Sequence, residues 1–340
     1  MNTEGLLRIH FTSEDQGRVR LATSTDWMWE VVLSLHLLQP GEPDPVFDPW
    51  RRRLAVSLSP ELKAAVDFLK VIDPKASYFP DFLTPATETG DVADGINAVR
   101  CTPRVQFSVQ LAELARTRAL PPRVRLLAIG DKDEVAHVCR TLRTYYDAAI
   151  APFRQLIDLR LAEVRHEYAH IAAGRGSEAL LRSLGPGYDW QPPLLLTRYP
   201  FDRDLYLGGR GLLLIPSFYC VRHPVTLFDR ELSPVLVLPV RRDPRWLSGS
   251  GRCAAGGETL GDLLGDTRAR ILELAGNDAL ATGAIAGKLR ISAQTISYHT
   301  KILRDAGLIT SNRDGASVVH HLTAMGVALL NGRPTPVGQW

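Results

Sequence analysis

Residues 282–309 read TGAIAGKLRISAQTISYHTKILRDAGLI, and this stretch decides the fold of the C-terminal part of the chain. Its first part predicts a helix over 282–289, and Ser292 is a favourable N-cap for a second helix that runs to Ala306. Gly307 follows at the position where glycine commonly ends a helix. Two short helices separated by a short turn are typical of a helix-turn-helix unit.

The sequence on either side of this stretch predicts the rest of a small domain. Residues 267–275 predict a preceding helix. After the unit, two strand-like runs at 308–311 and 317–322 flank Asp314-Gly315, which is a strong signal for a β-hairpin. A helix over 323–330 would close the domain. This order of helices and hairpin predicts a winged helix-turn-helix fold.

The second helix of the unit is predicted to be amphipathic. Ile296, Thr300 and Leu303 fall on one stripe and are expected to face the core. The residues outside this stripe include a glutamine and several hydroxyl side chains. A glutamine can form two hydrogen bonds to adenine, and hydroxyls can form hydrogen bonds to base edges or phosphates. An arginine at a hairpin tip can enter a narrow minor groove or hold a phosphate. We therefore predict that double-stranded DNA is contacted by Thr282, Ser292, Gln294, Thr295, Ser297, Tyr298, Lys301 and Arg313.

Two runs in this region resemble a known family. Residues 292–309 look like the recognition helix and first wing strand of the ArsR-like winged-helix regulators, and residues 263–272 look like their first helix. The resemblance covers roughly the last quarter of the chain. It implies a bacterial repressor or activator that binds a two-fold DNA operator as a homodimer.

Two positions depart from the pattern of this family. Arg290 stands in the turn where the family usually has glycine, and it would strain the turn if that position requires a positive φ. Thr300 stands on the core stripe where the family usually has leucine. Family members that sense metals use cysteine pairs or clusters of histidine and aspartate, whereas no cysteine follows Cys253 here. We therefore expect no metal sensing at that position and no cofactor.

The N-terminal part of the chain predicts a separate, larger domain. Small flexible residues mark a linker at 246–257. Residues 332–340 are expected to form a tail after the second domain. Residues 1–245 are expected to form an α+β domain that binds a small-molecule effector, dimerises, or does both, and residues 258–331 the winged helix-turn-helix domain. The runs 7–11, 78–85 and 211–218 resemble the region that accompanies such winged helices in actinobacterial regulators, which implies no particular chemistry.

The elements predicted in this domain place strands at both ends and helices between them. The longest helix, over 152–173, is expected to end at Gly174. Gly208-Gly209-Arg210-Gly211 predicts a hairpin turn rather than a phosphate loop. The other predicted helices are 26–38, 60–71, 105–116 and 132–148, and the predicted strands are 6–11, 18–21, 194–196, 205–207, 212–215 and 235–238.

Composition sets the class of protein. The chain has 340 residues, of which 45% are hydrophobic and 23% charged, as in a soluble globular protein. Its apolar runs are too short to span a bilayer, its N-terminus carries no export signal, and its four scattered cysteines indicate reduced, cytoplasmic thiols. From Glu258 onward the sequence contains eight basic and seven acidic residues. The non-specific electrostatic attraction to DNA is therefore expected to be modest.

One motif points to a different function. His166-Glu167-Tyr168-Ala169-His170 has the spacing of zinc peptidases, in which two histidines share a helix face and the glutamate activates a zinc-bound water. A third zinc ligand is not evident in the sequence. The nearest candidate, Glu178, lies beyond Gly174 and Gly176, where the helix is expected to have ended. We therefore expect no enzyme, and a zinc-dependent hydrolase fused to a winged helix is the alternative.

Two further alternatives stay open. A winged helix can bind protein instead of DNA, although the ordered pattern of helix, cap, stop and hairpin favours DNA. A set of aromatic residues in the N-terminal domain either fills the core or lines a ligand pocket, and large aromatics favour the core. This set comprises Trp27, Trp29, Trp50, Tyr78, Phe79, Phe82, Phe218 and Tyr219.

Overall fold

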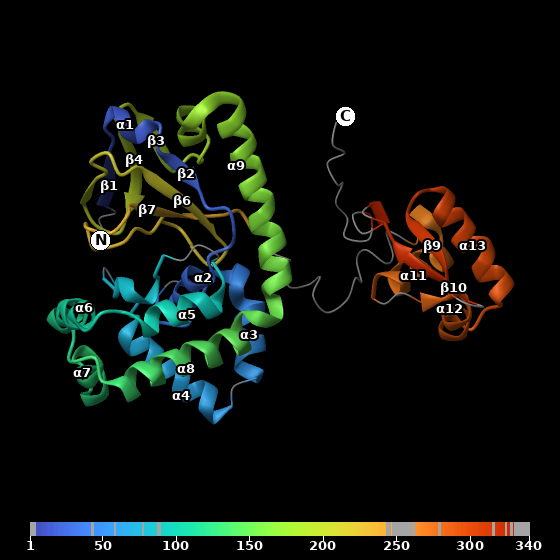
Figure 1. The fold of residues 1–340 in the computed structure, drawn as a ribbon, viewed down its shortest axis with the longest axis horizontal. Coiled ribbons are helices and arrows are strands. Elements are labelled where there is room, and N and C mark those ends of the chain that lie inside the picture. Colours follow the sequence, from blue (N-terminus) through green and yellow to red (C-terminus); the bar gives the residue numbers. More distant parts are fainter. Residues whose placement is uncertain are drawn as a thin grey trace. The chain divides into compact units, whose positions relative to one another are not determined.

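A computed structural model divides the chain into an N-terminal unit, Met1–Pro244, and a C-terminal unit, Arg245–Trp340 (Figure 1). The predicted linker at 246–257, apart from Trp246, and the predicted tail at 332–340 lie outside the residues that the structure describes. Described are residues 5–41, 44–57, 59–76, 78–86, 90–242, 246, 261, 263–277, 280–314, 317–323, 325–326 and 329.

Strands from the two ends of the N-terminal unit pair with one another. One sheet has the order β3-β4-β1-β5, with β1 antiparallel to β4 and parallel to β5. The other has the order β2-β6-β7, and all of its pairs are parallel. The strands are β1 (Gly5–His10), β2 (Val19–Leu21), β3 (Tyr188–Gln191), β4 (Leu194–Tyr199), β5 (Arg203–Tyr206), β6 (Leu212–Ser217) and β7 (Val235–Pro239).

The segment Gly208–Gly211 joins β5 to β6. The prediction of a hairpin turn is wrong, because these strands lie in different sheets. Gly208, Gly209 and Gly211 all have positive φ. Asp15 accepts the N–H groups of Gly209 and Gly211 at 3.2 and 2.8 Å. The turn is thus fastened to the N-terminal segment and carries the chain from one sheet to the other.

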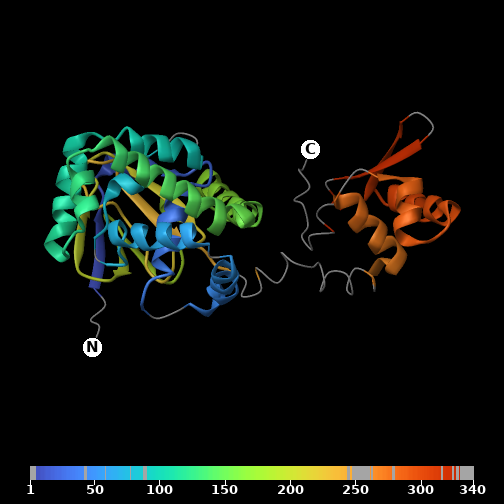
Figure 2. The same cartoon turned by 90° about the horizontal axis from the view of Figure 1, so that it is seen from below.

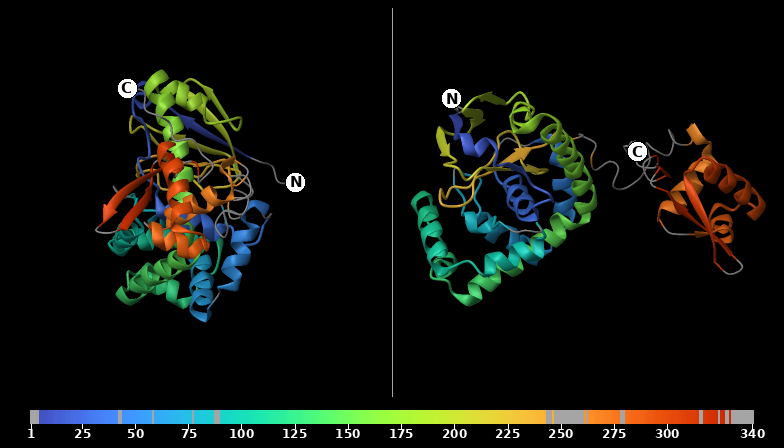
Figure 3. Two further views of the ribbon diagram at one scale, coloured as in Figure 1. Left: turned by 90° about the vertical axis from the view of Figure 1, so that its right-hand side faces the viewer. Right: turned by 45° about the horizontal axis from the view of Figure 1, so that its top comes forward.

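Helices fill the middle of the sequence. In the right-hand view of Figure 3 they curve around the strands, and the dark blue helix α2 lies inside the curve. Nine of the ten residues of α2 are buried, Glu30 among them. The helices are α1 (Ser13–Gln16), α2 (Trp27–His36), α3 (Asp48–Val56), α4 (Pro60–Ile72), α5 (Val92–Arg100), α6 (Arg104–Thr117), α7 (Pro122–Ala128), α8 (Lys132–Ala149) and α9 (Arg154–Arg182), with three short 3-10 helices, η1 (Pro45–Phe47), η2 (Asp81–Leu83) and η3 (Ala151–Phe153).

The long helix α9 does not end where the sequence predicts. It runs past Gly174, and its helical backbone breaks at Gly176, which has φ 80° and ψ 175°. Beyond the break, Leu180 and Leu181 pack into the hydrophobic core that the strands form, where Leu7 is also buried. The predicted end at Gly174 is therefore wrong, because this packing continues the chain in a second helical segment.

All eight aromatic residues singled out in the sequence are buried. The interpretation as core is therefore confirmed for Trp27, Trp29, Trp50, Phe82 and Phe218. Tyr78, Phe79 and Tyr219 also line a cavity in the same unit.

In the part of the C-terminal unit that the structure describes, helices α11, α12 and α13 accompany a sheet of order β8-β10-β9. Figure 2 shows its hairpin of β9 and β10 standing out from the helices. The helices predicted at 267–275, 282–289 and from Ser292 onward are confirmed, whereas the helix predicted at 323–330 lies partly outside the described residues. The elements are α11 (Asp266–Asn277), β8 (Leu280–Ala281), α12 (Thr282–Leu289), α13 (Ala293–Asp305), β9 (Ile309–Asp314) and β10 (Ser317–Leu322).

This unit has a core of its own, to which each helix contributes. Ile271 of α11, Ile285 of α12 and Ile296 of α13 are each fully buried, and Leu308 and Ile309 extend the core towards the sheet. Among the helices of the described residues, in either unit, none is both long and apolar enough to cross a membrane.

Candidate nucleic-acid interface

A turn of three residues joins α12 to α13. Arg290 caps the end of α12 in the left-handed conformation, with φ 57° and ψ 40°. An L-residue other than glycine adopts this conformation at a cost of about 1–2 kcal/mol. The structure thus assigns a positive φ to the turn position where the resemblance expects glycine, and the turn carries the corresponding strain.

The turn ends at Ser292, which caps α13 as predicted. Its hydroxyl accepts the N–H of Thr295 at 3.1 Å and is hydrogen-bonded to the Thr295 hydroxyl at 2.8 Å. Both hydroxyls therefore have a partner within the first turn. They lie at the N-terminus of the helix, where backbone N–H groups and the helix dipole favour an anion such as a phosphate.

One face of α13 is buried, as the sequence predicts. Ile296, Thr300 and Leu303 are 0%, 2% and 1% exposed. The hydroxyl of Thr300 donates to the carbonyl of Ile296 at 2.9 Å and lies 3.2 Å from that of Ser297. The helix backbone therefore satisfies this hydroxyl, and Thr300 occupies a core position without an unpaired polar atom.

The opposite face of α13 exposes four of the predicted DNA-contacting side chains. Gln294, Ser297, Tyr298 and Lys301 are all exposed, and their spacing of three and four residues places them on one side of the helix. Tyr298 is 64% exposed, so its ring and hydroxyl are accessible to a partner. This face combines a bridging amide, two hydroxyls and a cation.

Thr282 is engaged within the protein. Its hydroxyl is hydrogen-bonded to Nε2 of His320 at 2.9 Å, and Nδ1 of His320 is hydrogen-bonded to the hydroxyl of Ser311 at 2.9 Å. Burial lowers the pKa of His320. This chain of hydrogen bonds ties the start of α12 to both strands of the hairpin, so Thr282 positions α12 against the sheet.

Arg313 lies on β9, where its backbone pairs with Val318 of β10. The hairpin residues Gly315 and Ala316 lie outside the described residues. Two cations outside the predicted DNA-contacting set are exposed on the helix pair: Lys288 of α12 and Arg304 of α13. Arg304 follows Lys301 by three residues, and this helical spacing is the signal that could have added it to the set.

The zinc-peptidase motif lies on α9. His166, Glu167 and His170 are exposed, whereas Tyr168 packs against the core of the strands. Among the described residues, no group of three histidine, cysteine, aspartate or glutamate side chains is placed to hold a metal ion.

A protein-family model described as a helix-turn-helix domain matches residues 263–312. No curated protein and no solved structure gives a significant match to the chain. The matched residues include α11, α12 and the whole exposed face of α13. Residues 263–312 thus constitute a helix-turn-helix domain, and this supports a DNA-binding regulator.

Proposed function

We propose that this protein is a transcriptional regulator of the ArsR-like type, which binds double-stranded DNA sequence-specifically as a homodimer. In this proposal α13 enters the major groove, and the β9–β10 hairpin acts as the wing against the DNA backbone or the minor groove. The N-terminal unit senses a small-molecule effector. The effector shifts the affinity for DNA by its difference in affinity for two arrangements of the protein.

The observation that carries the proposal is the composition of the exposed face of α13. Gln294, Ser297, Tyr298 and Lys301 share this face, and the buried face opposite anchors the helix in the core. Side chains of this kind read base edges and hold phosphates. A helix that served only to close the domain would gain nothing from an exposed tyrosine flanked by an amide and a cation.

Two copies of the chain are part of the proposal. The region from Glu258 onward has a net charge of only +1, counted from eight basic and seven acidic residues. One such module gains little from phosphate attraction, whereas a dimer doubles the groove contacts and reads two half-sites one helical turn apart.

Selection of bound duplexes from a random pool by the full chain tests this function. We expect enrichment of one motif with two-fold symmetry. Gln294→Ala and Tyr298→Ala should relax the motif, whereas their matched controls in the N-terminal unit, Gln106→Ala and Tyr206→Ala, should leave it unchanged. A pool that shows no enrichment, or variants that all select the parental motif, would overturn the assignment of α13.

The proposal includes no enzymatic activity. After dialysis the full chain should retain no stoichiometric zinc, and His166→Ala should change nothing in its metal content. Retention of about one zinc per chain that is lost in His166→Ala would instead support the hydrolase, since bound metal requires both helix-borne histidines.

A further inference from the structure

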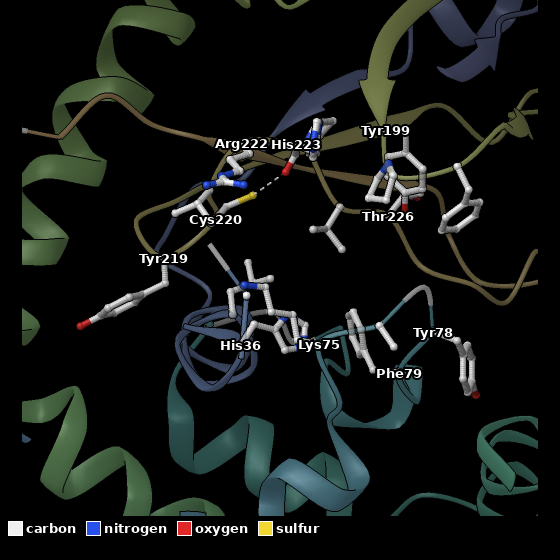
Figure 4. Close-up of a pocket in the computed structure, with 18 of the residues that line it drawn as sticks. His36, Lys75, Tyr78, Phe79, Tyr199, Tyr219, Cys220, Arg222, His223 and Thr226 are labelled. Carbon is white, nitrogen blue, oxygen red and sulfur yellow. Dashed lines mark hydrogen bonds between the residues drawn. The ribbon is translucent and has the colours of Figure 1, made fainter. Parts of the chain in front are cut away.

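The N-terminal unit contains a large cavity that the DNA-binding function does not use. Its volume is about 1110 Å³, slightly above the range of about 300–1,000 Å³ that is typical of small-molecule pockets. Figure 4 shows that its walls come from the end of α2 with His36, from the Lys75–Phe79 region, and from the loop after β6 with Cys220 to Thr226.

The loop after β6 is held firmly in place. The guanidinium of Arg242 donates to the backbone carbonyls of Phe218 and Cys220. Val225 exchanges two backbone hydrogen bonds with Val237 of β7, at 3.0 and 2.8 Å. Within this loop Arg222 has the left-handed conformation, with φ 63°. Strain of this kind occurs preferentially at ligand-binding sites.

Among the described residues, two polar atoms of the segment Cys220–Thr226 lack a hydrogen-bond partner. Nδ1 of His223 and Oγ1 of Thr226 are buried and have no hydrogen-bond partner among the described residues. A buried polar atom without a partner costs about 1–3 kcal/mol, so such atoms are rare. Both residues line the cavity, so a ligand that enters there can supply the missing partner.

The charges of the lining favour an anion. Lys75, Arg203 and Arg222 contribute three cations, and Asp44 and Asp81 contribute two anions. Both anions have partners within the protein, and so does Arg203, whose guanidinium donates to the carbonyl of Leu227 at 2.6 Å. The carboxylate of Asp81 accepts the N–H groups of Phe228 and Asp229 at 3.0 and 2.7 Å. The carboxylate of Asp44 caps η1 by accepting the N–H of Val46 at 3.0 Å, and it lies 3.9 Å from Arg242.

Part of the lining is apolar. It includes Leu33, Leu37, Phe79, Phe201 and Val225. A pocket that joins such a surface to a few cations and unsatisfied hydrogen-bonding atoms suits a ligand with an apolar body and one charged end.

We propose that this cavity binds a small organic carboxylate, whose carboxylate group lies near Lys75, Arg222 and His223 and whose apolar body packs against Leu37 and Phe79. The proposed ligand is a candidate for the effector of the proposed function. Only the effect of this ligand on DNA affinity rests on that function. Ligand binding itself needs no DNA.

The test compares 1-naphthylacetate with its neutral analogue 1-naphthylacetamide on the full chain without DNA, by isothermal titration calorimetry. We expect one carboxylate bound per chain and binding of the amide at least about tenfold weaker, because the amide lacks the charge that the lining cations attract. Arg222→Gly should weaken carboxylate binding about threefold to tenfold without loss of folding, since glycine adopts the same backbone conformation freely.

The chain offers matched controls. Arg290→Gly is the control for Arg222→Gly, because Arg290 also has the left-handed conformation. Lys63→Ala is the control for Lys75→Ala, because Lys63 is an exposed cation of α4 outside the cavity lining. Neither control should alter binding. Absence of carboxylate binding, equal binding of acid and amide, or parental affinity in Arg222→Gly would overturn the inference. Loss of DNA binding with intact carboxylate binding would overturn the proposed function and leave this site standing.

Discussion

The two units of this protein treat polar groups in opposite ways. The N-terminal unit buries carboxylates inside its core, such as Glu30, Asp73 and Asp81, and uses them to fasten segments far apart in the sequence. Among the described residues of the C-terminal unit, polar side chains lie on the open face of α13, and the buried Thr300 and His320 are satisfied within the unit, Thr300 by its own helix and His320 by Thr282 and Ser311. The N-terminal unit therefore uses buried polar groups to join distant segments, whereas the C-terminal unit presents polar groups on its surface.

Glu30 illustrates the first strategy. Its two carboxylate oxygens accept the N–H groups of Phe218 and Tyr219 at 2.9 and 3.0 Å, at the start of the loop that forms the cavity wall. Helix α2 and that loop are almost two hundred residues apart in the sequence. The carboxylate fixes the cavity wall to the most deeply buried helix of the unit.

The largest effect is expected from Glu30→Ala. It leaves two buried N–H groups without an acceptor, so we expect the N-terminal unit to lose about 3–4 kcal/mol of unfolding free energy. Urea titration with hydrogen exchange locates the loss, and the C-terminal unit should be unaffected. The control Glu167→Ala, exposed on α9, should change the unfolding free energy by less than about 0.5 kcal/mol. Equal effects of the two variants would contradict the role of Glu30.

Stability should also depend on pH through Glu30. Burial raises the pKa of its carboxyl from 4.5 to about 7, against the hydrogen bonds from Tyr219 and Phe218. The folded chain then keeps a proton that the unfolded chain releases, so the stability of the N-terminal unit falls as pH rises from about 4.5 to about 7. The fall amounts to about 3 kcal/mol.

Asp26 adds to this trend, because burial raises the pKa of its carboxyl to about 6. Subtracting the pH profile of Glu30→Gln isolates the contribution of Glu30. The difference should be concentrated between pH 4.5 and 7. Parallel profiles for the two proteins would show that the buried carboxyl titrates normally.

A smaller effect is expected on the open face of α13. Gln294→Ala should lower the discrimination between the selected and a mismatched duplex by about 1–2 kcal/mol. Lys301→Ala should weaken binding to both duplexes evenly and reduce the salt dependence by about one phosphate contact. Fluorescence anisotropy at several salt concentrations separates the two. If Lys63→Ala changed the salt dependence as much, phosphate contact would not be specific to α13.

The smallest effect is expected from relief of strain in the turn. Arg290→Gly places glycine, which adopts the left-handed backbone conformation freely, at this position of the turn. It should stabilise the C-terminal unit by about 0.5–1 kcal/mol. Thermal unfolding of the full chain, with hydrogen exchange to locate the change, measures it. A destabilised variant would mean that contacts of the Arg290 side chain outweigh the strain.

The sequence predicted the C-terminal unit closely because its signals are local. Ser292 and Gly307 mark the ends of α13 by capping chemistry that acts within a few residues, and the expectation that Arg290 would be strained in the turn agrees with its φ of 57°. The hydrogen bonds from Thr282 to His320 were not predictable, because they join residues of different elements.

The N-terminal unit was predicted less well because its decisive contacts are long-range. Its strands were predicted except for β3, but nothing near Leu205 or Leu212 indicates that β5 and β6 belong to different sheets. Either Gly174 or Gly176 could break helix α9. The packing of Leu180 in the core favours the break at Gly176. The cavity draws its walls from Leu33 to Phe228 and left no pattern in the sequence beyond scattered aromatics.

The central claim is that the exposed face of α13 reads base edges. It is tested most directly by the ratio of affinities of the full chain for a selected duplex and for the same duplex with a scrambled sequence, at one fixed salt concentration. The account predicts that the selected duplex binds at least about a thousandfold more tightly. Equal affinity for the two duplexes would contradict it.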